Sequence, residues 1–330
     1  METSATVLII YNPVAGKGTI GKNIRRIREL FKENGINVLS FATKGQNDAY
    51  RAALTFSKKY GTRHEDLNGR DRYFVVSAGG DGTLDEVMRG VLDSKRDVPI
   101  GIIPVGSTND FGYSLGLSGN PMDNARIIID CIRDNKLFRS DIATLNGKYF
   151  TYTASFGLFS DVSYMTPRKM KNMLGHFAYI LYGAMRLPRT RKICAGIKYD
   201  GNDIRKELLL GMVVSAKSVG GFRNITGKNV RLDDGEHELM MVLWPKNITS
   251  LIKTVKQAFD LMKGKRAVEK EVNNVDRDYG IIILKAKNIC FDFERKTPFS
   301  VDGEEGGEFE KADIEVLNGR IRYICPVNND

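Results

Sequence analysis

The chain has 330 residues, 42% of them hydrophobic, so it can bury one large core or two smaller ones, and we expect two domains. Fifty Lys and Arg against forty Asp and Glu give a net charge of +10, which favours an anionic partner: nucleic acid, a nucleotide phosphate or an acidic membrane face. The four cysteines are widely separated and form no CxxC pair, so neither a zinc site nor a dense disulfide framework is expected.

The first part of the chain alternates between strand-like and helix-like segments. Short apolar, β-rich runs predict strands at 7–11, 36–43, 73–79 and 100–106. Apolar residues at helical spacing follow the first strand and stop before Gly35, and a second helix is predicted from Asn47 to about Tyr60. This order predicts an α/β domain with a parallel sheet and flanking helices, which we place at residues 1–138.

From residue 139 onwards the pattern changes to short alternating or apolar runs separated by turn residues. Several strands in series predict an antiparallel sandwich or a barrel-like domain, which we place at residues 139–317. Two helical segments interrupt it, at about 168–187 and 249–264. Residues 318–330 could pack back on the first domain. The fold class is therefore an α/β domain followed by a β-rich antiparallel domain.

The sharpest chemical signal is the segment SAGGDGTLDEV at 77–87. Gly79, Gly80 and Gly82 would let the backbone approach a phosphate closely, and a helix that starts near Thr83 would aim free N–H groups at it. A bare carboxylate at Asp81 would repel that phosphate, unless it holds a magnesium ion or takes a proton from an attacking hydroxyl. A tight turn with Asp81 as helix cap explains this segment equally well when it is considered alone.

Two more polar loops follow strands of the same predicted sheet. NPVAGKG comes after the first strand but is not a Walker A loop, because GxxxxGK[ST] is absent. PVGSTNDFG comes after the fourth strand. Open α/β sheets bind ligands at the carboxyl ends of their strands, so these loops favour a nucleotide site. Their candidate residues are Asn12, Gly16, Lys17 and Gly18 in the first loop, and Ser107, Thr108, Asn109 and Asp110 in the second.

The motifs NPVAGKG, GGDGTLDEV, PVGSTNDF, ASFGLFSDV, LDDGEHELMMV and VDGEE, in this order, resemble the diacylglycerol kinase catalytic family, close to its bacterial soluble lipid kinases. GGDGT also occurs in NAD kinases and 6-phosphofructokinases, but its combination with GSTNDF and a late DGE is highly specific. The resemblance implies an ATP-binding α/β domain and a β-rich lipid-substrate domain with the active site in the cleft between them. It implies ATP and Mg²⁺ as cofactors and a membrane lipid, with diacylglycerol leading, as the phosphate acceptor. An NAD kinase-like enzyme, or a kinase of phosphatidylglycerol or a sphingoid base, remains the alternative.

The resemblance also implies roles for single residues. Thr43 matches a nucleotide-contacting threonine, and Ser107 keeps the hydroxyl of a residue that is usually threonine in the family. Glu304 is the expected general base, with Asp302 and Asp81 as further catalytic carboxylates. For Asp302 and Glu304 the alternative is an acidic β-turn in a solvated run. The residues expected to line the ATP phosphates are Gly79, Gly80, Asp81, Gly82, Thr83, Leu84 and Asp85.

LDDGE resembles a loop that holds a structural magnesium ion in the family. By that match Asp234 would give a side-chain ligand, and Arg231 and Glu236 would give backbone carbonyls. Glu236 departs from the pattern, because it replaces an apolar residue that is common there.

The segment 165–192 suggests how the protein reaches a lipid. It surrounds the apolar run FAYILYGAM with seven basic residues and no acidic one. The run is too short to span a bilayer but suits an anionic interface; an amphipathic helix packed on the β-rich domain is the alternative. We expect a cytoplasmic protein that attaches peripherally to an anionic membrane surface, with no nucleic-acid partner because no aromatic-basic stacking motif is present. An exposed strand could pair two copies into a homodimer, but no sequence feature requires it.

Overall fold

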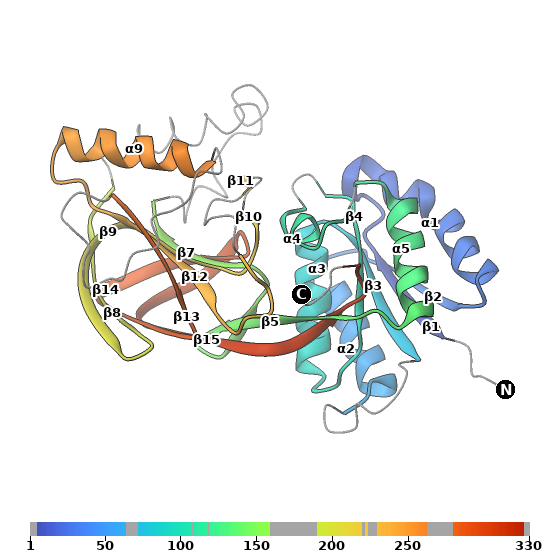
Figure 1. The fold of residues 1–330 in the computed structure, drawn as a ribbon. Helices are drawn as coiled ribbons and strands as arrows, with labels where there is room; N and C mark the ends of the chain where they lie inside the picture. The colour runs from blue at the N-terminus through green and yellow to red at the C-terminus, as the bar shows by residue number, and fades with distance from the viewer. Residues whose placement is uncertain are drawn as a thin grey trace. The chain divides into compact units, whose positions relative to one another are not determined.

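The computed structural model describes residues 5–63, 72–106, 109–117, 119–158, 190–219, 222–223, 230–262 and 280–326. The chain divides into two compact units (Figure 1): Met1–Asp141 together with Gly319–Asp330, and Ile142–Asn318. The expected boundary after residue 138 lies close to this division. The last residues of the chain belong to the first unit, because Tyr323 pairs in parallel with Ile100.

The sheet of the first unit is made of strands that pair in parallel. They are β1 (Thr6–Tyr11), β2 (Asn37–Ala42), β3 (Tyr73–Gly79) and β4 (Ile100–Pro104), in the order β4-β3-β1-β2. β1, β3 and β4 are almost fully buried, which explains why they are continuous apolar runs instead of alternating ones.

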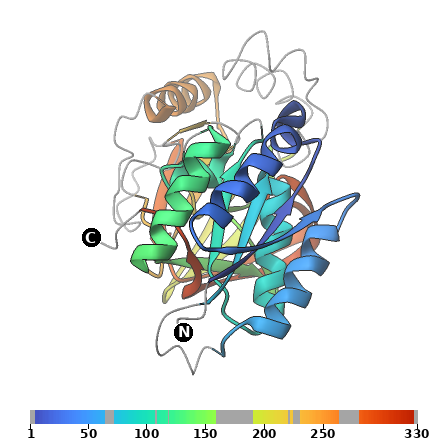
Figure 2. The ribbon, with the colours of Figure 1, turned by 90° about the vertical axis from the view of Figure 1, so that its right-hand side faces the viewer.

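Helices cover this sheet on both faces. They are α1 (Ala15–Glu33), α2 (Asp48–Tyr60), α3 (Asp81–Asp93), the short α4 (Asp110–Ser114) and α5 (Pro121–Asp134). α1 and α5 lie side by side over one face (Figure 2), where Ile27 and Ile128 join the same core as Val7 and Ile9 of β1. Leu8 alternates with Val7 and Ile9, so it faces the opposite side of the sheet, where α2 contacts β1 and packs on α3.

The second unit is β-rich and its strands pair antiparallel. They are β5 (Phe138–Leu145, which begins in the first unit), β6 (Lys148–Phe150), β7 (Thr153–Gly157), β8 (Ile193–Tyr199), β9 (Asn202–Val214), β12 (His237–Leu243), β13 (Ile281–Ala286), β14 (Asn288–Val301) and β15 (Glu304–Tyr323), with the short pair β10 (Ser218–Val219) and β11 (Phe222–Arg223). β7 and β8 each pair with a different part of both β9 and β14.

The expected antiparallel, β-rich character of this unit is confirmed, and its sandwich or barrel-like form stays a prediction. The expected helix at about 249–264 is α9 (Ile248–Met262), whereas the one at about 168–187 lies outside the described residues. Among the helices that are described, none is long and apolar enough to cross a membrane.

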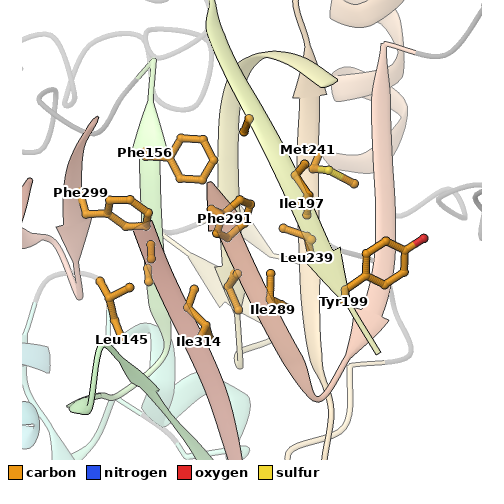
Figure 3. Packing of buried hydrophobic residues seen from close by; sticks show 14 of the residues in the cluster. Leu145, Phe156, Ile197, Tyr199, Leu239, Met241, Ile289, Phe291, Phe299 and Ile314 are labelled. Carbon is orange, nitrogen blue, oxygen red and sulfur yellow. The ribbon is translucent and has the colours of Figure 1, made fainter. Parts of the chain in front are cut away.

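Aromatic rings fill the core of the second unit (Figure 3). The ring of Phe156 on β7 lies 5.0 Å from that of Phe291 and 4.9 Å from that of Phe293, and 5.1 Å from that of Phe299. Gly211 of β9 makes room for this ring, because a Cβ atom there would lie 2.2 Å from a Phe156 ring atom. The strands are thereby fixed against one another by a core of their own.

Candidate active-site loops and carboxylates

Three loops of the first unit converge at the carboxyl ends of β1, β3 and β4. A Cβ atom added to Gly16 would lie 2.2 Å from the carbonyl oxygen of Val105, and one added to Gly106 would lie 2.8 Å from the Cα atom of Gly80. Such distances are too short for any side chain, so the glycines allow the three backbones to meet. The sequence predicted loops at one edge of the sheet, and the structure brings these glycines into contact distance.

The loop after β1 is the irregular first turn of α1. The helix begins at Ala15, inside the expected glycine loop, and Gly16 and Gly18 have φ values of +57° and +80° that side chains rarely adopt. Asn12 stabilises the turn, since its Oδ1 accepts a hydrogen bond of 3.2 Å from the N–H of Val14. The side chain of Lys17 lies outside what the structure describes.

The GGDGT segment forms the start of α3. Gly80 is the N-cap residue, and its carbonyl accepts from the N–H groups of Thr83 and Leu84 at 3.0 and 3.2 Å. Asp81 is the first residue of the helix, two positions earlier than expected. The helix N-terminus carries partial positive charge and N–H groups without intrahelical partners, so it favours an anion.

Some positions of this segment are packed against neighbours and others face open space. Thr83 covers Gly79, where a Cβ would lie 2.4 Å from its Oγ1, and Leu84 is buried. A Cβ at Gly82 would meet nothing within 4 Å, so the backbone there is open to a ligand. Asp85 is drawn to Arg89, with 3.5 Å between carboxylate and guanidinium.

The loop after β4 is closed by its own asparagine. Asn109 has a φ of +51°; its Oδ1 accepts from the N–H of Gly106 at 2.7 Å, and its Nδ2 donates to the carbonyl of Gly106 at 2.9 Å. The Asn109 amide therefore shapes the loop next to Gly80. Asp110 begins α4 and is buried. Ser107 and Thr108 lie outside the described residues.

Two carboxylates hold the loop after β2. Thr43 follows the strand, and its N–H donates to the carbonyl of Tyr11 at 2.9 Å. The carboxylate of Asp48 accepts from the N–H groups of Lys44 and Gly45. Glu86 of α3 accepts from the N–H groups of Asn47 and Ala49 at 2.8 and 3.0 Å, which joins the starts of α2 and α3. No sequence pattern indicates this role of Glu86, since its partners lie almost forty positions away.

Asp302 in the second unit is held by the backbone of a neighbouring segment. Its carboxylate accepts from the N–H groups of Thr151 at 2.5 Å, Tyr152 at 2.9 Å and Thr153 at 3.0 Å. Asp302 and Gly303 have φ values of +51° and +84° and form the two-residue turn between β14 and β15. These bonds give Asp302 an anchoring function in the hairpin, and the catalytic function expected for it stays a prediction.

Glu304 directly follows that turn. It is the first residue of β15, it pairs with Val301 across the hairpin, and its side chain is exposed. The turn is thus the acidic β-turn considered as an alternative, and it also presents Glu304 on a backbone that Asp302 fixes. An exposed carboxylate on a rigid turn can accept a proton from a bound hydroxyl.

The LDDGE loop of the second unit already contains a cation. The ammonium group of Lys285 on β13 donates to Oδ2 of Asp234 at 2.5 Å and lies 3.7 Å from Oε1 of the buried Glu238. Burial raises the pKa of Glu238 to about 8, and the charge of Lys285 opposes that shift. Lys285 therefore balances the negative charge that a structural metal ion would balance.

The other residues expected around the magnesium ion make contacts within the loop. Oδ1 of Asp234 accepts from the N–H of Glu236 at 3.2 Å, and the carbonyl of Glu236 lies 2.9 Å from Nδ1 of His237. The guanidinium of Arg231 pairs with Asp233. Within the described residues no three His, Cys, Asp or Glu side chains are grouped to hold a metal ion. The structural magnesium ion expected at this loop, with one side-chain ligand and two backbone carbonyls, stays a prediction.

The basic segment expected at a membrane falls mostly outside the described residues, which resume at Thr190. Of its basic residues, Lys192 pairs with Glu207 at 2.7 Å, and both side chains are about half exposed. The structure thus leaves the predicted role of residues 165–192 untested.

Comparison with known proteins identifies the class to which this fold and these loops belong. Residues 6–141 match the family described as "Diacylglycerol kinase catalytic domain". The diacylglycerol kinase of Bacillus subtilis (strain 168) is 32% identical over 299 residues, which cover 91% of this chain and 89% of that protein. The diacylglycerol kinase of Staphylococcus haemolyticus is 30% identical, over 98% of this chain and 91% of that protein.

Solved structures agree with the sequence comparison. The crystal structure of a putative diacylglycerol kinase from Bacillus anthracis str. Sterne superposes with a TM-score of 0.72 at 26% identity and covers 98% of this chain and 96% of that one. The chain belongs to the diacylglycerol kinase family. It is a lipid kinase, an enzyme that transfers phosphate to an alcohol group.

Proposed function

We propose that the protein transfers the γ-phosphate of ATP, with Mg²⁺, to the hydroxyl of a membrane lipid, and that diacylglycerol is the acceptor. The observation that carries this proposal is the convergence of the glycine loops at Gly16, Gly80 and Gly106, in a chain of the diacylglycerol kinase family. The open backbone at Gly82, in the first turn of α3, is suited to the phosphates of a nucleotide.

The residues of the first unit would bind and orient the phosphates. Open backbone at Gly82 and the first turn of α3 would donate hydrogen bonds to phosphate oxygens. Asp81, at the start of that helix, would hold the magnesium ion, which supplies neutralisation of phosphate charge when it is bound. Glu86 and Asn109 stabilise this arrangement, because their hydrogen bonds fix the adjoining loops.

Glu304 would act as the general base. Its exposed carboxylate would take the proton of the lipid hydroxyl while the hydroxyl oxygen attacks the γ-phosphorus of ATP. The bond between the γ-phosphorus and the bridging oxygen then breaks, and ADP leaves. The turn that precedes Glu304 is fixed by three hydrogen bonds to Asp302. Since positioning supplies much of the catalysis in phosphoryl transfer, this rigidity supports the assignment of Glu304.

The substrate is tested by transfer of radiolabel from γ-labelled ATP with Mg²⁺ to mixed micelles. The panel contains diacylglycerol, phosphatidylglycerol, a sphingoid base or ceramide, and NAD serves as the water-soluble control. We expect chloroform-soluble label on diacylglycerol, and none with the Asp81→Asn variant at unchanged melting temperature. Label on another lipid would make that lipid the acceptor in place of diacylglycerol. Label on NAD alone would contradict the lipid assignment.

We also propose that the enzyme attaches peripherally to the cytoplasmic face of a membrane. The net charge of +10 supports attraction to an anionic bilayer. Binding to anionic vesicles that weakens as salt is raised would agree with this proposal, and binding that is indifferent to salt would contradict it.

A further inference from the structure

Helix α9 is fixed to the second unit along one side. Thr254 and Leu261, seven positions apart and hence on the same side of the helix, are buried. Oε1 of Gln257 accepts hydrogen bonds from the N–H groups of Gly280 and Ile281, at 2.9 and 3.1 Å, where β13 begins. Gly280 allows this close approach, because a Cβ there would collide with Thr254. The helix is thus held in one orientation, drawn in orange in Figure 1.

The opposite side of α9 exposes two large aliphatic side chains. Ile248 is 77% exposed and Ile252 is 63% exposed, and they are two of the five large hydrophobic residues that are exposed in the described part of the chain. They are four positions apart, so they lie one above the other on the helix surface. A lone exposed isoleucine is ordinary, but a pair on one fixed stripe creates an apolar ridge.

Lysines flank this ridge. Lys246, Lys253 and Lys256 are exposed, and they outnumber the single acidic residue of α9, Asp260, which lies one turn after Lys256. Positive charge beside an apolar ridge complements the surface of an anionic bilayer, where phosphate groups lie directly above the acyl chains. A second copy of this chain fits poorly, because it would bring lysines against lysines. We call Ile248, Ile252, Lys253 and Lys256, together with Lys246 just before the helix, the outer face of α9.

We propose that the outer face of α9 is a docking surface for an anionic phospholipid bilayer, with the helix lying in the interface. Ile248 and Ile252 enter the boundary between headgroups and acyl chains, while the lysines contact lipid phosphates. This inference rests on the proposed function, since a kinase of membrane lipids must reach an acceptor embedded in a bilayer. It assigns membrane contact to residues other than the basic segment 165–192.

The test is sedimentation of the full chain with phosphatidylglycerol–phosphatidylcholine vesicles. We expect the Ile248→Ser/Ile252→Ser variant to bind about tenfold more weakly than the unchanged protein, at the same melting temperature. The Lys253→Gln/Lys256→Gln variant should bind more weakly and show a shallower salt dependence. The matched control is Leu39→Ser/Phe41→Ser, which removes two other exposed hydrophobic side chains, on β2, and should bind like the unchanged protein.

Activity separates this inference from the proposed function. On a water-soluble short-chain diacylglycerol the isoleucine variant should keep its turnover, and on vesicle-embedded diacylglycerol it should lose about tenfold. Failure of the unchanged protein to phosphorylate either form would contradict the acceptor alone, because vesicle binding is measured without turnover. Equal vesicle binding by the isoleucine variant and the unchanged protein would overturn the docking surface. So would a change of oligomeric state in that variant by analytical ultracentrifugation, which would assign the ridge to a second copy.

Discussion

At the residue scale, the loops of the first unit meet where side chains are missing. Gly106 and Gly80 approach so closely that a single methyl group at Gly106 would press on backbone and on Oδ1 of Asn109, both at 2.8 Å. The amide of Asn109 cannot withdraw without losing both of its hydrogen bonds to Gly106. The backbone therefore determines how closely the loops at Gly80 and Gly106 approach each other.

Gly106→Ala tests this directly. We expect a loss of about 1–3 kcal/mol in the free energy of unfolding, as for other overpacked sites. Gly119→Ala is the matched control, because a Cβ there would meet nothing within 4 Å, and it should change stability by less than about 0.5 kcal/mol. Urea unfolding of both variants measures the difference, and equal stabilities would contradict the close approach.

Substitutions of Asp302 and Glu304 should have different effects, the first on stability and the second on activity. Asp302→Ala leaves three backbone N–H groups without their carboxylate, so we expect a loss of about 1–3 kcal/mol of stability. Glu304→Gln changes an exposed side chain, so the melting temperature should stay constant while the rate of phosphate transfer falls by about 10²-fold or more. Full activity in Glu304→Gln would remove this residue from the mechanism.

At the scale of elements, β13 and the LDDGE loop are joined by an internal cation. Lys285→Met would leave the carboxylate of Asp234 without its positive partner, which should cost about 2 kcal/mol, below the range for fully buried pairs because Lys285 is partly exposed. In the absence of nucleotide, Mg²⁺ and a chelator should give the unchanged protein the same melting temperature. A rise with Mg²⁺ would point to a metal ion at this loop after all.

The control for that experiment is Lys311→Met. The ammonium group of Lys311 lies 3.9 Å from Asp313, and both side chains are well exposed, so solvent screens the pair. Little change in stability is expected. A similar loss in both variants would show that the partial burial of Lys285 and Asp234 has no part in the effect.

His237 on β12 predicts how stability depends on pH. Burial lowers the pKa of His237 to about 4, and its Nε2 has no hydrogen-bond partner among the residues that the structure describes. In the unfolded chain His237 binds a proton below its ordinary pKa of about 6.5, whereas in the folded chain it stays neutral down to about pH 4. Stability should therefore fall as pH decreases through this window, by up to about 1.4 kcal/mol per pH unit.

His237→Gln isolates that contribution. Other titrating groups, Glu238 among them, remain in both proteins, so the difference between the two stability profiles reports His237. The variant should lose less stability than the unchanged protein between about pH 6.5 and pH 4. Parallel profiles in chemical denaturation would mean that His237 accepts its proton in the folded state.

At the scale of the whole molecule, the elements were easier to predict than their contacts. The buried runs of β1, β3 and β4 and the family motifs gave the α/β and β-rich parts, because period and order are local properties. The start of α1 was missed, since Gly16 and Gly18 resemble a loop but form the first turn of the helix. The hydrogen bonds of Glu86 join residues 37 and 39 positions apart, and those of Asp302 span about 150. Single-sequence patterns hold no signal for such partners.

A buried ion pair helps to hold the C-terminal part of β15 in the first unit. Arg322 binds Asp97 at 2.7 Å, and the two side chains are 8% and 4% exposed. Arg322→Met should cost about 3–5 kcal/mol, because it leaves Asp97 charged in the core of the first unit. The double variant Arg322→Met/Asp97→Leu should recover part of that loss in thermal unfolding. No recovery would mean that Asp97 is balanced by other groups.

This placement of the C-terminal part makes the first unit discontinuous along the chain. Its sheet begins with β1 but includes Tyr323, which packs against Phe111 and donates through its hydroxyl to the sulfur of Met88. A ribosome synthesises residues 142–318 between these two parts, so the first unit begins before the second and is completed after it. A nascent chain that stalls before residue 319 holds nearly all of that unit, yet lacks both Tyr323 and the arginine that neutralises Asp97. Termination of translation just before residue 319 would thus damage a unit whose larger part is already synthesised by residue 141.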